Sequence, residues 1–142
     1  MVGPARRFKT ADVAQQMVGG FLLAGPFVVT AEVWQLATNM SNLQLVLAVS
    51  IVFLIGYGAL YKADQRDPDR ETEVAGIPLR FLSLMAVSFG SVLLLALVFD
   101  APATFFADFD VAPGDRVLVT AKAVSVGAIF SVVGAATADS VF

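Results

Sequence analysis

Residues 117–141 read VLVTAKAVSVGAIFSVVGAATADSV, an apolar run whose ionisable side chains are Lys122 and Asp139. A helix needs about 20 apolar residues to cross the roughly 30 Å of hydrocarbon in a bilayer. Three further apolar runs precede this one, over residues 14–37, 43–61 and 79–99. The sequence therefore predicts an all-α, polytopic membrane protein built as a bundle of four transmembrane helices.

The composition indicates one integral membrane domain over residues 1–142. Hydrophobic residues make up 58% of the chain and charged residues 15%, with no Cys and no His. Soluble domains average nearer about half apolar and roughly a quarter charged. This composition excludes a soluble enzyme core, a disulfide scaffold and any Cys/His metal site. The formal net charge of −3 excludes a basic nucleic-acid-binding face.

No catalytic pattern accompanies the apolar runs. The sequence has no nucleophile–base pair, phosphate-binding loop or haem-ligand pattern. We therefore expect a protein that is not an enzyme and that takes neither a cofactor nor a metal ion. Its expected surroundings are the lipid bilayer, with a small ion or polar solute as the candidate ligand.

The basic residues predict the orientation in the membrane. They gather in the N-terminal tail and in the connection between the second and third runs: Arg6, Arg7, Lys9, Lys62, Arg66, Arg70 and Arg80. The first connection has no Lys or Arg, and the last has Arg116 alone. Because cytoplasmic loops carry the excess of Lys and Arg, both termini are predicted to be cytoplasmic, in a multi-pass protein of the cell membrane.

Two ionisable residues within the predicted spans mark a candidate site, because such residues are costly in a membrane. Glu32 and Lys122 each lie about 9 Å from the outer boundary at 1.5 Å per residue, and their charges are opposite. We expect them to pair between the first and fourth helices, which would offset part of their desolvation cost. Gln35 and Ser125 lie one turn further on the same helix faces, and complete a predicted site for an ion or polar solute.

Two functions remain open on these residues. The first is an oligomeric channel or transporter whose path includes Glu32 and Lys122. The second is a non-transporting accessory or structural subunit, in which the Glu32–Lys122 pair fixes the packing of the helices or the two side chains snorkel to the interface. A third polar residue, Asp139, lies near the cytoplasmic end of its span, and we expect it to contact Arg6, Arg7 or Arg80.

Small residues at helical spacing predict where helices pack closely. The predicted packing residues lie in the first and fourth runs: Gly20, Ala24, Gly25, Pro26, Ala123, Gly127, Ser131 and Ala135. Pro26 also predicts a kink in the first span, which neighbouring helices can accommodate. Stripes of this kind allow close approach either within the bundle or across a dimer interface. We therefore expect a homo-oligomer.

Residues 25–34, Gly-Pro-Phe-Val-Val-Thr-Ala-Glu-Val-Trp, carry a resemblance to known proteins. They resemble the first-span signature of an uncharacterised family of prokaryotic integral membrane proteins, in which Pro is followed by Thr, Glu and Trp. Short haloarchaeal members are similar to this chain in length and acidity. The resemblance implies a helical membrane protein and no particular activity. Glu32 and Val33 resemble more weakly the small multidrug-resistance transporters, although the Lys-containing continuation of that family is missing here.

Overall fold

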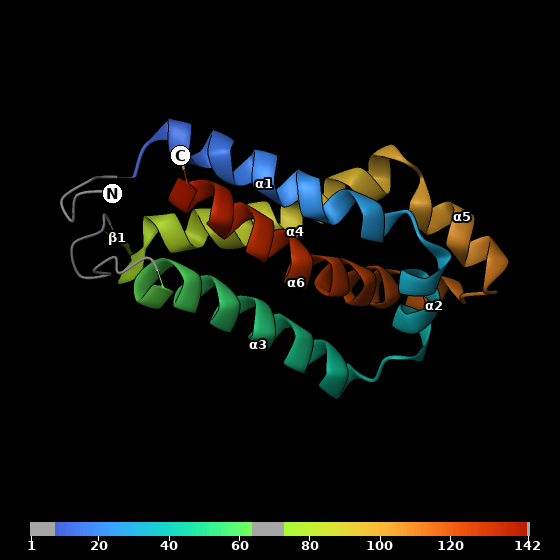
Figure 1. Ribbon diagram of the computed structural model, residues 1–142. Helices are drawn as coiled ribbons and strands as arrows, with labels where there is room; N and C mark the ends of the chain where they lie inside the picture. The colour runs from blue at the N-terminus through green and yellow to red at the C-terminus, as the bar shows by residue number, and fades with distance from the viewer. Residues whose placement is uncertain (1–7, 64–72, 142) are drawn as a thin grey trace.

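The computed structural model describes residues 8–63 and 73–141 and is mostly helical (Figure 1). Three helices are long and apolar enough to cross a membrane. They are α3 (Asn42–Gly58), which continues into a π-helical turn over Ala59–Ala63, α4 (Leu79–Val98) and α6 (Arg116–Val141). These helices match the apolar runs predicted at 43–61, 79–99 and 117–141. The predicted membrane character and helical class are therefore confirmed.

The first predicted span is not one helix. It consists of α1 (Thr10–Val28) and α2 (Ala31–Asn39), whose axes are bent by 82°. Pro26 lies in the last turn of α1, where its missing N–H weakens the helix. Thr30 then adopts an extended backbone, and its hydroxyl donates to the Phe27 carbonyl at 3.1 Å. The interruption predicted at Pro26 is present, but it is a bend between two helices rather than a kink within one. The described residues contain three candidate spans, or four if the bent pair counts as one.

Short elements lie at the two ends of the bundle (Figure 1). At one end, the α2/α5 end, lie α2 and α5 (Ala101–Asp108). At the other end, the hairpin end, α1 begins and α6 finishes beside the strands β1 (Glu73–Val74) and β2 (Ile77–Pro78). The strands pair antiparallel around a two-residue turn with positive φ at both positions, a geometry that favours a tight hairpin. Neither α5 nor the hairpin was predicted from the sequence.

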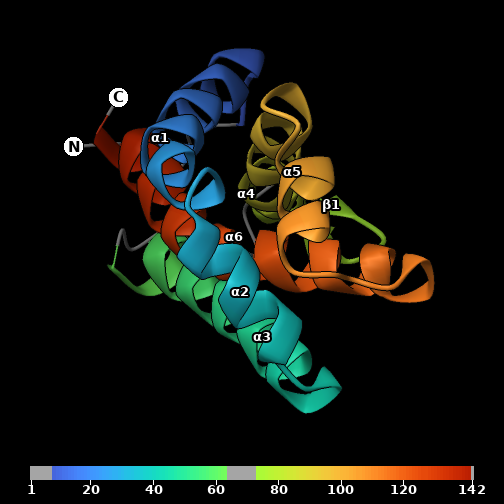
Figure 2. The same cartoon turned by 90° about the vertical axis from the view of Figure 1, so that its right-hand side faces the viewer.

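Helix α6 lies at the centre of the packing (Figure 2). It contacts α1, α2, α3 and α4. Its closest crossing is with α1, where Gly19 and Gly134 face each other so tightly that a Cβ atom on either would collide with the other's carbonyl oxygen. Next to this crossing, the Ser131 hydroxyl donates to the Gly20 carbonyl at 3.2 Å and lies 3.0 Å from the Ser91 hydroxyl. Small residues are therefore what allow α1, α4 and α6 to meet.

Candidate functional site

The structure separates the two residues that were expected to pair. Glu32 is exposed in the first turn of α2, whereas Lys122 on α6 has only 7% of its surface exposed. No ion pair joins them. The prediction of a Glu32–Lys122 pair is therefore wrong. Matching depth was inferred for a continuous first helix, and the 82° bend before α2 turns Glu32 away from α6.

The other two predicted site residues do not join Lys122 either. Gln35 is exposed on α2, and its backbone carbonyl accepts hydrogen bonds from Thr38 and Asn39. Ser125 is buried on α6, where its hydroxyl donates to the Ala121 carbonyl at 2.8 Å. The four residues predicted as one site therefore lie in separate surroundings, and Lys122 is the one that is both charged and buried.

Lys122 is held at the α2/α5 end by a single hydrogen bond. Its Nζ atom donates to the backbone carbonyl of Met40 at 2.6 Å, in the connection between α2 and α3. An ammonium group has three N–H donors, so two remain without an acceptor among the residues that the structure describes. No described carboxylate forms an ion pair with it. A buried charge without a counter-ion is costly, which makes this position a candidate binding site.

A polar cavity adjoins this ammonium group. Its volume is about 420 Å³, and it is lined by Thr38, Phe109, Asp110, Val111, Ala112, Asp115, Leu118, Val119 and Lys122. The lining therefore comes from α2, from the segment between α5 and α6, and from the first turns of α6. Glu32 is not among the residues that line this cavity. We call this space the Lys122 cavity.

Aromatic packing fixes the walls of the Lys122 cavity. Trp34 on α2 is fully buried, and its ring lies 5.8 Å from the rings of both Phe105 and Phe106 on α5. Phe105 in turn stacks on Phe109, which lines the cavity, at 6.2 Å. Aromatic pairs at these separations add to the free energy gained by burial. They tie α2 and α5 together over the beginning of α6.

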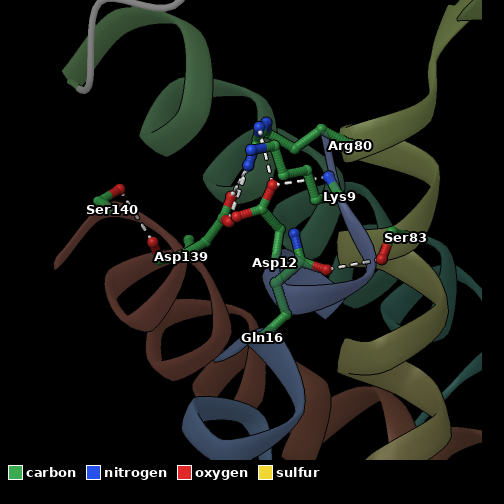
Figure 3. A network of polar contacts seen from close by, with 8 residues as sticks. Lys9, Asp12, Gln16, Arg80, Ser83, Asp139 and Ser140 are labelled. Atoms are coloured by element: carbon green, nitrogen blue, oxygen red, sulfur yellow. Dashed lines mark hydrogen bonds and ion pairs between the residues drawn. The ribbon is translucent and has the colours of Figure 1, made fainter. Parts of the chain in front are cut away.

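A second polar centre lies at the hairpin end (Figure 3). The Arg80 Nη1 atom donates to both carboxylate oxygens of Asp139, at 2.8 and 3.0 Å, and Nη2 donates to Asp12 at 3.3 Å. All three residues are at most 5% exposed. The expected contact between Asp139 and Arg80 is confirmed, whereas Arg6 and Arg7 lie outside the described residues. We call Asp12, Arg80 and Asp139 the charged triad.

The charged triad sits where three packing stripes end. On each of α1, α4 and α6, every fourth residue faces the interior, as the helical period requires. The stripes are Asp12, Gln16, Gly20 and Ala24 on α1, then Arg80, Leu84, Ser88, Val92 and Ala96 on α4, and Ala123, Gly127, Ser131, Ala135 and Asp139 on α6. Apart from Gln16, each stripe therefore carries small or apolar residues along its length and a charged residue at the hairpin end.

The small residues of these stripes pack inside the bundle. Gly20, Ala24, Ala123, Gly127, Ser131 and Ala135 are all buried against helices of the same chain. Gly25 is half-buried and Pro26 is exposed. The fourth-helix stripe therefore packs inside the bundle, where it is not available as a dimer interface. The small-residue stripe on α6 therefore does not support the expected homo-oligomer.

The sequence reasoning missed Asp12 and Gln16. Gln16 is fully buried one turn beyond Asp12, and its Oε1 atom accepts a hydrogen bond of 2.7 Å from the Ser83 hydroxyl of α4. Its Nε2 atom makes no hydrogen bond in the part of the chain that the structure describes. The signal was present in the sequence, because Asp12 and Gln16 continue the spacing of Gly20 and Ala24 by two more turns. Among the described residues, no group of three or more His, Cys, Asp or Glu side chains could hold a metal ion.

Apolar spans, an interior of small residues and polar centres at both ends define a polytopic helical membrane protein. A comparison with known families places the chain more closely. A family described as "Putative integral membrane protein (DUF2391)" matches residues 5–139, and the chain belongs to it. The expected membership of an uncharacterised membrane-protein family is thereby confirmed at this level. Searches of the curated proteins and of the solved structures found no match.

Proposed function

We propose that this protein is a small channel or transporter that admits an ion or a small polar solute through the Lys122 cavity. The observation that carries the proposal is Lys122, a residue that is 7% exposed and whose Nζ atom has one backbone carbonyl as its partner among the described residues. Ionisable groups inside membrane proteins are usually paired, or line a pathway for ions or substrate. Lys122 has no described carboxylate partner, and it lines a cavity.

The size and lining of the Lys122 cavity support this proposal. Small-molecule sites typically occupy about 300–1,000 Å³, and the cavity measures about 420 Å³. Its lining combines apolar residues with the ionisable residues Asp110, Asp115 and Lys122. A few polar groups in an otherwise apolar wall are what orients a small ligand.

The proposal places the Lys122 cavity on the outer face of the membrane. The hairpin end carries Lys9 and Arg80, and the remaining basic residues counted for that side are Arg6, Arg7, Lys62, Arg66 and Arg70. Of these, Arg6, Arg7, Arg66 and Arg70 lie outside the described residues. The α2/α5 end carries Arg116. An excess of basic residues favours the cytoplasm, so the hairpin end is the proposed cytoplasmic end.

This orientation can be measured with single cysteines, because the chain has none of its own. Ala103 on α5 and Glu73 on β1 are both exposed and lie at opposite ends of the bundle. We expect a membrane-impermeant maleimide to label the Ala103→Cys variant in intact cells, and the Glu73→Cys variant after lysis alone. Labelling in the reverse order would place Lys122 on the cytoplasmic side and contradict the proposed orientation.

Lys122→Met should reduce solute flux at least tenfold if Lys122 lies in the path. The full chain would be reconstituted in liposomes, and swelling followed by light scattering with potassium chloride, potassium acetate and glycine as solutes. The matched control is Lys9→Met, which removes an exposed lysine at the other end of the bundle. Equal flux in Lys122→Met and the unchanged protein would exclude the cavity from the path.

A second function, a non-transporting accessory subunit, is favoured by the charged triad. Asp12, Arg80 and Asp139 tie three helices at one end, and the Ser91–Ser131–Gly20 contacts tie the same helices further along. Contacts of this kind hold α1, α4 and α6 in one arrangement, as expected for a structural subunit. Absence of flux for every solute in the unchanged, folded protein would favour this function. The expected pair of Glu32 and Lys122 has no part in it.

A further inference from the structure

The Lys122 cavity holds charges of both signs that do not meet. Asp110 and Asp115 line it together with Lys122, yet neither carboxylate forms an ion pair with the ammonium group. Both aspartates are exposed, whereas Lys122 is buried. The two acidic residues of the lining are therefore more exposed than the basic one.

The backbone fixes the aspartates in this arrangement. Asp110 has a left-handed backbone with φ of 54°, and the next residue, Val111, donates its N–H to the Phe106 carbonyl at 3.1 Å. Asp115 belongs to a 3₁₀ turn (Pro113–Asp115), and its N–H donates to the Ala112 carbonyl at 2.9 Å. The first bond attaches the segment between α5 and α6 to α5, and the second closes a turn within that segment, so both aspartates are carried on hydrogen-bonded backbone.

We infer that the ligand of the Lys122 cavity is a small zwitterion with one carboxylate and one ammonium group, the charge pattern of a free amino acid. This inference rests on the proposed function and names its solute class. The ligand carboxylate would accept hydrogen bonds from the two N–H groups of Lys122 that have no acceptor in the described part of the chain, and the ligand ammonium group would donate to Asp110 or Asp115. Hydrogen bonds between ionised groups are the strongest of their kind.

Ligands with a single charge fit this arrangement less well. An inorganic anion on Lys122 would share the cavity with two carboxylates and be repelled by both. A simple cation near the aspartates would face the buried ammonium group instead. In a zwitterion, the carboxylate is attracted by Lys122 and the ammonium group by the aspartates. Both ends of the ligand therefore gain from binding.

Calorimetric titration of the full chain in detergent micelles tests this inference. The probes are glycine, β-alanine and γ-aminobutyrate, which separate the two charges by increasing distances, with acetate and methylammonium as single-charge analogues. We expect at least one zwitterion to bind tenfold or more tightly than either analogue. Lys122→Met, and the double variant Asp110→Asn with Asp115→Asn, should each weaken that binding at least tenfold. Asp108→Asn, an exposed aspartate outside the cavity lining, should leave it unchanged.

The outcomes separate this inference from the proposed function. Acetate binding as tightly as every zwitterion, and unaffected by the double aspartate variant, would overturn the zwitterion and leave an anion site. Flux that depends on Lys122, without binding of any zwitterion, would also overturn the inference alone. Absence of both binding and flux in the folded protein would overturn the inference and the proposed function together. Circular dichroism and gel filtration establish that each variant is folded.

Discussion

Replacing Arg80 with methionine should lower the free energy of unfolding by about 3–5 kcal/mol, the usual cost of removing one partner from a buried ion pair. Arg80 is 1% exposed and is hydrogen-bonded to both Asp12 and Asp139. Without the guanidinium group, these two carboxylates would remain buried with one charged partner fewer. Methionine keeps most of the side-chain volume, so the effect measures the lost charge rather than a cavity.

The measurement is unfolding of the protein in mixed micelles, followed by circular dichroism. Arg116→Met is the matched control, because Arg116 is exposed and its contacts are a weak bond of 3.4 Å and a position over the Phe106 ring. Adding Asp12→Asn and Asp139→Asn to Arg80→Met should recover part of the loss, since the two carboxylate charges that lost the guanidinium group are then removed. A loss below about 1 kcal/mol for Arg80→Met would contradict a structural role for the charged triad.

Gly19→Ala should be the second large effect, with a loss of roughly 1–3 kcal/mol, as expected for an overpacked interior. The new Cβ atom would collide with the carbonyl group of Gly134 on α6. Backbone atoms cannot rotate away as a side chain can, so α1 and α6 must separate. Their separation would also stretch the hydrogen bond between Ser131 and Gly20.

The control for this substitution is Gly90→Ala on α4. Gly90 is exposed, and a Cβ atom there would meet nothing within 4 Å. Alanine is favoured over glycine within a helix by about 1 kcal/mol, so the control should be neutral or slightly stabilising. The same unfolding assay compares the two variants. Equal effects at both positions would show that the α1–α6 crossing tolerates greater separation than the structure indicates.

The apolar runs were sufficient to predict α3, α4 and α6, because a span is defined by length and composition alone. The break between α1 and α2 was visible only as Pro26. The direction of the chain beyond it depends on Trp34 docking against Phe105 and Phe106, which are distant in sequence. Contacts of this kind are tertiary, and no local pattern specifies them.

The candidate site was predicted in part for a similar reason. Lys122 was identified because a lysine within an apolar run is costly wherever it lies. Its partner was inferred from matching depth and opposite charge, and two such side chains meet only if their helix faces also point toward each other. Asp12 was passed over because it precedes the apolar run, although its four-residue spacing from Gln16 and Gly20 continues the buried face of α1.

The central position of α6 has a consequence for how the protein is made. Helix α6 follows α1, α3 and α4 in the chain, yet it contacts all three. During synthesis, the earlier helices therefore enter the bilayer before the helix around which they pack. Asp12 and Arg80 are both made before Asp139, so the triad is completed late. Assembly of the bundle must then follow insertion as a separate step, in which the earlier helices complete their packing after α6 has been inserted.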